Sequence, residues 1–513
     1  MTTAFTLSAQ SPTGFAAARF LSQASWGPTA AAVAEVQAIG FDRWIDKQMD
    51  PSQTPLSTIP PYGVDAKGNT TLRPVQDAFF VNAVTGQDQL RQRVAFALSE
   101  IWVVSGVKLR PEAIQPYLQL LQADAFAGYD QIMYDITVSP AMGHYLDMVN
   151  NNKPTATHGA DENYAREMLQ LFTIGLVQLD QYGRPVLDPT TKQPIPTFTQ
   201  DVIEGFARTF TGWTYAPSRN GASKFPNPAN WTAPMVPFDA NHDSSPKLLL
   251  NGVTLASKAG PGEALSDLQF ALNNIFTHPN VAPFISRQLI QHLVTSSPSD
   301  QYVKDVADVF TATHGDMRAV VKAILLDPEA RAGDDGTSQA ATGHLREPVL
   351  FINALMRELN ANIAASNGLT DYANAMGQYL YYPASVFSYF LPGYQIPVAD
   401  ASPPTTANAP EFQLLSESTA QVRVNFMNTV AFGRINGVTP TLTSYIGSLG
   451  GKPTMTSITA MISALNNDLL GGAMSADMQN SILPAVQVAG SPTAMVETAL
   501  YLIGSSWTYQ VER

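Results

Sequence analysis

The sequence contains no cysteine. Disulfide bonds, thiolate nucleophiles, zinc–thiolate sites and covalently attached c-type haem are therefore excluded. The chain also has no uninterrupted apolar run of about 18 residues, the length that a helix needs to cross a bilayer. We therefore do not expect an integral membrane protein. The first residues have neither a basic segment nor an apolar segment, so we expect that any signal peptide has been removed from this sequence.

Charged residues are also scarce, at 14% of the chain. The 29 basic residues are outnumbered by 42 acidic ones, which gives a formal net charge of -13. This is the wrong sign for a protein that follows phosphate backbones, so nucleic acid is not an expected partner. A weakly charged, cysteine-free chain favours an exported bacterial protein, and we expect a periplasmic or secreted location.

Hydrophobic residues make up 45% of the sequence, enough for a large core. Helical periodicity covers most of the chain, and alternating patterns are rare. The pattern predicts an all-α fold, a single large irregular helical domain with a small β-hairpin insertion and long Pro- and Trp-rich loops. The expected parts are a main helical domain at 1–393 with loop insertions at 51–73, 177–197 and 214–262, a Pro-rich break at 394–410, and a C-terminal helical segment at 411–513 packed on the main body.

The clearest polar pattern lies in residues 161–175, where we expect a two-faced helix. Glu162, Asn163, Arg166 and Glu167 share the polar side. These residues fit either a solvated face with a surface salt bridge or the wall of a cleft. In a cleft, Glu162 or Glu167 acts as general acid or base while Arg166 keeps the other ionised. Arg166→Ala would then cost about 3–5 kcal/mol, against about 0.3–0.5 kcal/mol for an exposed pair.

Residues 199–211 repeat this design. Glu204 and Arg208 are four residues apart, so we expect them to pair on one stripe of a second helix. Because only a hairpin separates the two helices, we expect both charged stripes to reach one rim. Either the stripes form a structural network of ion pairs between helices, or Glu204 and Arg208 join a catalytic site.

A second group of polar residues follows in the long loop after Trp213, and it includes His242 and Lys247. We regard Trp213, His242 and Lys247 as binding candidates, although a capped turn and a core tryptophan explain them equally well. No histidine shows a standard ligand spacing, so we predict no metal site unless the fold assembles one. The sequence identifies no cofactor.

Arg93 and Glu100 lie on the same stripe of an otherwise apolar segment, 87–105. If this helix is buried, neither charge can remain unpaired, because an isolated buried ion costs several kcal/mol. We expect them to pair with each other or across helices. A structural role is the simpler interpretation, and a role in a site is the alternative.

Several longer strings resemble a known family. They are FLSQASWG at 20–27, FDRWIDKQMDP at 41–51, RVAFALSEIWVVS at 93–105, ENYARE at 162–167, LFTIG at 171–175, ARTFTGW at 207–213 and REP at 346–348. Together they resemble the bacterial domain-of-unknown-function family 1800. The resemblance implies a mostly helical, usually exported protein, often encoded beside a family 1501 partner, and it implies no established reaction. It also favours the Glu162–Glu167 segment as a site.

Three functional hypotheses remain open, so the sequence does not decide whether the protein is an enzyme. The first is an extracytoplasmic hydrolase or lyase that acts on a carbohydrate-like polymer through paired carboxylates. The second is a non-catalytic binding or assembly protein that acts with a partner chain, for example a family 1501-type protein. The third is a metal or haem oxidoreductase.

Overall fold

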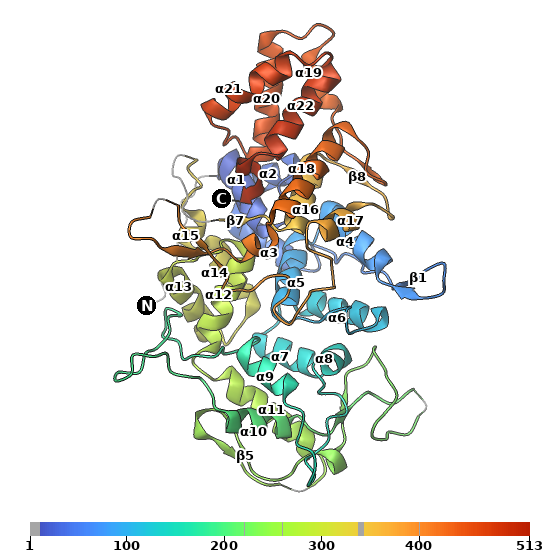
Figure 1. Cartoon of the computed structure of the whole chain (residues 1–513), viewed down its shortest axis with the longest axis vertical. Helices are drawn as coiled ribbons and strands as arrows, with labels where there is room; N and C mark the ends of the chain where they lie inside the picture. Colours follow the sequence, from blue (N-terminus) through green and yellow to red (C-terminus); the bar gives the residue numbers. More distant parts are fainter. Residues whose placement is uncertain (1–10, 220, 259, 337–342, 400, 513) are drawn as a thin grey trace.

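The computed structural model describes residues 11–219, 221–258, 260–336, 343–399 and 401–512 of the chain (Figure 1). Helices dominate these residues, and the strands form only two-stranded antiparallel sheets. The predicted all-α fold with small hairpins is therefore confirmed. None of the helices described combines the length and apolar character that a membrane crossing requires.

The first half of the chain carries α1 (Gly14–Ala24), α2 (Ala30–Ile39), α3 (Phe41–Met49), α4 (Arg73–Thr85), α5 (Gln89–Ile101), α6 (Pro111–Asp124), α7 (Tyr129–Thr137), α8 (Pro140–Tyr145), α9 (Asn163–Gln170) and α10 (Gln200–Thr209). The second half carries α11 (Glu263–Phe276), α12 (Val281–Leu293), α13 (Asp300–Ala312), α14 (Met317–Leu326), α15 (Pro328–Arg331), α16 (Pro348–Glu358), α17 (Leu369–Ala375), α18 (Glu417–Phe432), α19 (Thr443–Leu449), α20 (Met455–Leu470), α21 (Ala476–Gln487), α22 (Pro492–Gly504) and α23 (Trp507–Gln510).

The strands pair as β1 (Gly63–Val64) with β2 (Thr70–Thr71), β3 (Trp213–Thr214) with β4 (Val236–Pro237), β5 (Lys247–Leu248) with β6 (Thr254–Leu255), β7 (His344–Leu345) with β12 (Val511–Glu512), β8 (Asn362–Ile363) with β11 (Val438–Thr439), and β9 (Gln395–Pro397) with β10 (Thr406–Asn408). Three short 3-10 helices are η1 (Asp239–Asn241), η2 (Leu250–Gly252) and η3 (Pro410–Leu414). The expected hairpin at 177–197 holds only isolated bridges, between Val177 and Pro196, Leu179 and Pro185, and Leu187 and Pro194.

The helix starts follow local chemistry. The Thr13 hydroxyl accepts a hydrogen bond of 3.1 Å from the backbone N–H of Ala16 and so caps α1. In α3, Phe41, Trp44 and Ile45 recur at helical spacing, and all three are buried. Both helices lie where the sequence pattern predicts them.

Two hydrophobic cores hold the helices together. The first is built by helices from α1 to α14, and the second by α16 to α23 with contributions from α4 and α5. Helix α5 serves both, since Val94 and Leu98 belong to the first core and Phe96 to the second. In Figure 1, α5 accordingly lies in the middle of the elongated molecule, between α9–α11 at one end and α19–α22 at the other.

The end of the chain returns to this middle region. Strand β12 pairs with β7, which places Glu512 opposite His344. Polar residues on α5, on β7 and near the C-terminus therefore meet between the two cores.

Candidate functional site

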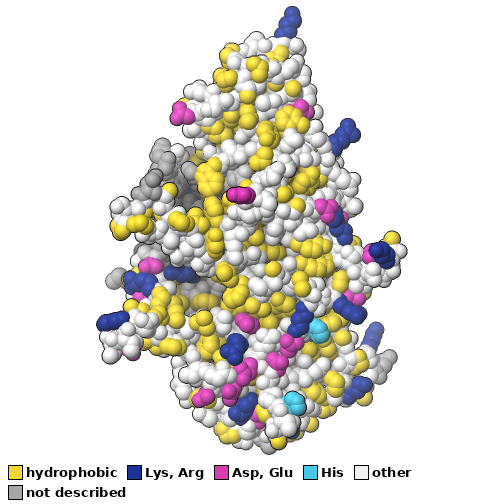
Figure 2. All heavy atoms as spheres, viewed as in Figure 1, with side chains coloured by type: hydrophobic (Ala, Val, Ile, Leu, Met, Phe, Trp, Pro, Cys, Tyr) yellow, Lys and Arg dark blue, Asp and Glu magenta, His cyan; other side chains and the backbone are white. Residues whose placement is uncertain are grey.

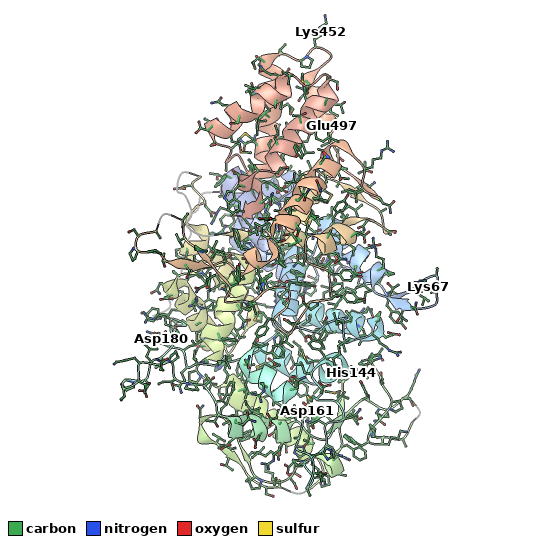
Figure 3. All side chains as sticks on the ribbon, in the orientation of Figure 1. Lys67, His144, Asp161, Asp180, Lys452 and Glu497 are labelled. Atoms are coloured by element: carbon green, nitrogen blue, oxygen red, sulfur yellow. The ribbon has the colours of Figure 1, made fainter. Side chains whose placement is uncertain are left out.

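Charged side chains gather on one face at the α9 end of the molecule. Figure 2 shows acidic side chains clustered there, next to a histidine, and Figure 3 labels Asp161 and His144 in the same region. We call this surface the charged rim and define it as Asp147, Asp161, Glu162, Asn163, Arg166, Glu167, Gln200 and Glu204. The rim is partly exposed. Its exposed residues are Asp147, Asp161, Gln200 and Glu204, and its half-buried residues are Glu162, Asn163, Arg166 and Glu167.

The rim forms where α9 packs against α10. Glu162 precedes the first residue of α9, and its Oε2 accepts hydrogen bonds from Arg166 Nη2 at 2.7 Å and from Gln200 Nε2 at 2.9 Å. Gln200 Nε2 also lies 3.4 Å from Oε1 of Glu204. The amide of Gln200 thus links carboxylates of the two helices, as the expected shared rim requires.

Glu167 has different surroundings from Glu162. It is half-buried, and burial raises the pKa of its carboxyl although Arg166 opposes the shift. Its Oε2 is buried without a hydrogen-bond partner in the described residues. The charge of Glu162 is therefore offset by Arg166, whereas burial of Glu167 favours its protonated form.

An aromatic group lies beside these carboxylates. His144 Nδ1 is 2.9 Å from the Tyr215 hydroxyl, and both rings make edge contacts with Trp231 at centroid distances of 5.4 and 5.3 Å. Asp147 is the rim residue with an electrostatic effect on His144 of this group, and its carboxylate accepts hydrogen bonds from Asn163 and Lys108. Lys108 and Asp147 both influence the pKa of His144, which burial lowers.

The predicted burial of Arg166 in a cleft is wrong. Its side chain is 40% exposed and that of Glu162 is 31% exposed, so their pair is a partly exposed i,i+4 bridge. The expected pairing of Glu204 with Arg208 is also wrong. Arg208 instead donates from Nε to Oδ2 of Asp243 at 2.6 Å and from Nη2 to the Pro246 carbonyl at 2.7 Å. It anchors the following loop to α10.

Trp213, a binding candidate in the sequence analysis, is fully buried, in agreement with the alternative of a core tryptophan. Strand β3 places its side chain in the first core. His242 and Lys247 are buried as well, and both contact Oδ2 of Asp267, at 3.1 and 2.7 Å. Because these contacts occupy both side chains inside the protein, their role in this structure is to join the long loop to α11.

Two groups of described residues bring three possible metal ligands within 4.8 Å of one another. One consists of His242, Glu263 and Asp267, and the other of Glu100, His292 and Glu347. In the first group, Lys247 already supplies a positive charge to Asp267.

Spacing along the sequence does not reveal the second group, because its residues come from α5, from α12 and from the turn before α16. Two sequence signals pointed towards it: the lone Glu100 in an apolar helix and the REP string that contains Glu347. Arg93 and Glu100 were expected to pair with each other or across helices, and the structure shows the second arrangement. Arg93 donates to the His292 carbonyl at 3.2 Å, and Glu100 Oε2 lies 3.1 Å from His292 Nδ1.

Comparison with known proteins gives a single family. A family model described as "Protein of unknown function (DUF1800)" matches residues 19–511, nearly the whole chain. No curated protein and no solved structure matches the chain.

Proposed function

We propose that this chain, which belongs to the DUF1800 family, is an extracytoplasmic hydrolase or lyase that acts on a carbohydrate-like polymer at the charged rim. One observation carries the proposal: Glu162, next to the start of α9, is hydrogen-bonded to Arg166, whereas burial raises the pKa of Glu167 within α9 although Arg166 opposes the shift. Acid–base enzymes need one carboxyl that holds a proton and a second that stays ionised, and they obtain the difference from the surroundings of each.

The roles follow from the contacts of each residue. Glu167 is the general acid, because burial favours its protonated form and leaves one oxygen without a partner. Glu162 is the carboxylate that stabilises positive charge or activates water, since Arg166 and Gln200 hold it in place. Glu204, bound to the same Gln200 amide, is a second candidate for the ionised role.

The neighbouring groups suit a sugar polymer. Trp231 is half-buried and offers part of an aromatic surface, on which the apolar face of a sugar ring can stack. Asn163 and Asp147 provide hydrogen-bonding groups between this ring and the carboxylates. A partly open surface also suits a long polymer better than a small metabolite, which enzymes usually enclose.

A periplasmic or secreted location is part of the proposal. It is supported by the absence of cysteine and the low content of charged residues. A polymer of the cell envelope or of the surroundings is therefore the expected substrate class.

The test is a cleavage assay on a panel of polysaccharides, including cell-wall glycans and polyuronates. New reducing ends report hydrolysis, and ultraviolet absorbance of unsaturated uronic ends reports elimination. We expect cleavage of at least one polymer by the wild type, and a loss of at least about 100-fold in Glu167→Gln, the usual contribution of a general acid. The matched control is Glu497→Gln on α22, at the far end of the molecule (Figure 3), which should cleave normally.

Two results would contradict the proposal. One is equal activity of Glu167→Gln and the control. The other is binding of a polymer or of a partner chain without any cleavage, which would instead support a non-catalytic assembly protein.

A further inference from the structure

Four acidic and imidazole side chains meet between the two hydrophobic cores, far from solvent. We call Glu100, His292, Glu347 and Glu411 the buried centre. The side chains of Glu100 and Glu411 are 1% and 3% exposed, and that of His292 is 12% exposed. Helices α5 and α12 pack together and bring Glu100 to His292, while Glu347 immediately precedes α16 and Glu411 lies in η3.

Glu411 has partners in the protein, because its Oε1 lies 3.4 Å from His344 Nδ1 and its Oε2 accepts a hydrogen bond of 2.7 Å from the Ser296 hydroxyl. In the described part of the chain, Glu100 and Glu347 have no such cationic partner besides His292. Among the described residues, no arginine or lysine lies within 4.0 Å of Glu100, Glu347 or Glu411 as an ion pair. The two nearby arginines donate elsewhere: Arg93 to the His292 carbonyl at 3.2 Å and Arg423 to the Arg346 carbonyl at 2.9 Å. Buried carboxylates without a partner cost several kcal/mol, so such a group calls for a cation or for protons.

The positions of the donor atoms favour a cation. Glu100 Oε2 and His292 Nδ1 face each other at 3.1 Å, yet Glu100 Oε2 has no hydrogen-bond partner in the described residues. Together with a carboxylate oxygen of Glu347, these atoms all lie within 4.8 Å of one another, close enough to bind one ion. The hydroxyl of Ser388 is buried and lacks a partner as well.

Three of these residues border the same small cavity. The cavity has a volume of about 10 Å³, close to the space that one water molecule or ion requires. Its lining includes Glu100, His292, Glu411 and Ser388. Glu347 does not line the cavity, but a carboxylate oxygen of Glu347 lies within 4.8 Å of the ligand atoms of Glu100 and His292. Ser388 has φ +67°, in the left-handed region that non-glycine residues rarely adopt and that is often found at functional sites.

A second layer of contacts fixes the two carboxylates. The Gln378 amide nitrogen donates to Glu347 Oε2 and lies 3.4 Å from Glu100 Oε1. The Gln378 carbonyl oxygen accepts from the Val349 backbone N–H at 3.0 Å, which sets the orientation of the amide. Metal-ligating carboxylates are typically oriented by outer hydrogen bonds of this kind. Glu100 Oε2 remains directed at His292.

We propose that the buried centre is a binding site for one divalent transition-metal ion, with Glu100, His292 and Glu347 as ligands. One imidazole nitrogen with two carboxylates suits Mn²⁺, Fe²⁺ or Zn²⁺ better than Ca²⁺ or Mg²⁺, which prefer oxygen ligands alone. This site is separate from the charged rim and does not depend on the function proposed there. The sequence shows no standard ligand spacing for such a site, because the ligands come from distant segments that the fold brings together.

The test is metal analysis of the full-length protein. The chain is stripped with a chelator, incubated separately with Mn²⁺, Fe²⁺ under reducing conditions and Zn²⁺, and passed over a desalting column before elemental analysis. We expect one equivalent of at least one of these ions per chain, a rise in melting temperature on binding, and loss of the ion in Glu100→Gln and in His292→Gln. Glu263→Gln, in the other carboxylate–histidine group, is the matched control and should retain the ion.

A spectroscopic measurement covers the case in which these variants fail to fold. Wild-type protein loaded with Co²⁺ should show d–d absorption and a paramagnetically shifted imidazole signal from one histidine. Absence of any bound ion in the wild type would overturn the proposal, and so would its retention in folded Glu100→Gln or its loss in Glu263→Gln. A Co²⁺ site without an imidazole ligand would overturn it as well.

Discussion

Gly205→Ala should destabilise the protein strongly. Helix α10 packs closely against the β5–β6 hairpin at Gly205, and the absence of a side chain there allows this close approach. A Cβ at this position would lie 1.8 Å from the carbonyl oxygen of Leu248. Non-bonded heavy atoms pack favourably at about 3.5–4.0 Å, so the overlap is well over 1 Å on this scale. Both groups are backbone or attached directly to it, and no side-chain rotation can relieve the clash.

The magnitude follows from two opposing effects. Overpacking costs about 1–3 kcal/mol and occasionally more, while replacing glycine by alanine within a helix gains about 1 kcal/mol. With an overlap this severe, we expect a net loss of at least about 2 kcal/mol. Since α10 carries Glu204 and Gln200, the displaced helix should also disturb the charged rim.

Urea denaturation followed by circular dichroism measures the effect as a lower midpoint. Gly447→Ala in α19 is the matched control, because nothing lies within 4 Å of its added Cβ. The control should be stabilised by up to about 1 kcal/mol. A Gly205→Ala midpoint equal to that of the wild type would refute the packing of α10 against β5.

Three further predictions concern the charged groups. Arg166→Ala should cost only about 0.3–0.5 kcal/mol in a urea melt, since its bridge to Glu162 is partly exposed, and a loss above about 2 kcal/mol would contradict this. Burial alone would raise the pKa of Asp243, but hydrogen bonds from Ser245 and Arg208 outweigh it and hold that pKa below its usual value. Asp243→Asn should therefore cost about 1.5–3 kcal/mol at neutral pH, and melts at falling pH should show the difference from wild type begin to shrink near pH 4 and vanish only below the lowered pKa of the folded-state carboxyl. For Glu167 the sign is opposite: its raised pKa means that the ionised form destabilises the fold, so Glu167→Gln should melt at or above the wild-type temperature at neutral pH, with no difference below about pH 4.

The fold class and many helices were predictable, because their signals are local. The spacing of Phe41, Trp44 and Ile45 and the Asp50–Pro51 stop define α3 as observed. The helix expected at 161–175 is shorter, since it ends at Gln170 and a turn leads to Gly175, where φ is +72°. The turn residues that follow Gln170 set the end of this helix, and helical periodicity in the sequence does not predict them.

For the candidate sites too, features with local sequence signals were predictable and features that depend on distant contacts were not. The charged rim was predictable, because its carboxylates recur on two consecutive helices and Gln200 joins them. The partner of Arg208 was not, since Asp243 reaches it only after the long loop folds back. The buried centre depends on the packing of α5, α12 and α16, and the spacing of Glu100, His292 and Glu347 along the chain carries no trace of their proximity.

The most direct test of the proposed rim chemistry is the pKa of Glu167, measured by ¹³C NMR of glutamate carboxyl carbons during an acid titration. The signal that disappears in Glu167→Gln identifies the residue without any knowledge of the substrate. Our account predicts that this carboxyl titrates above the usual range of glutamate, because it is half-buried with one oxygen unpartnered. A pKa at or below the usual value would contradict the assignment of Glu167 as the general acid.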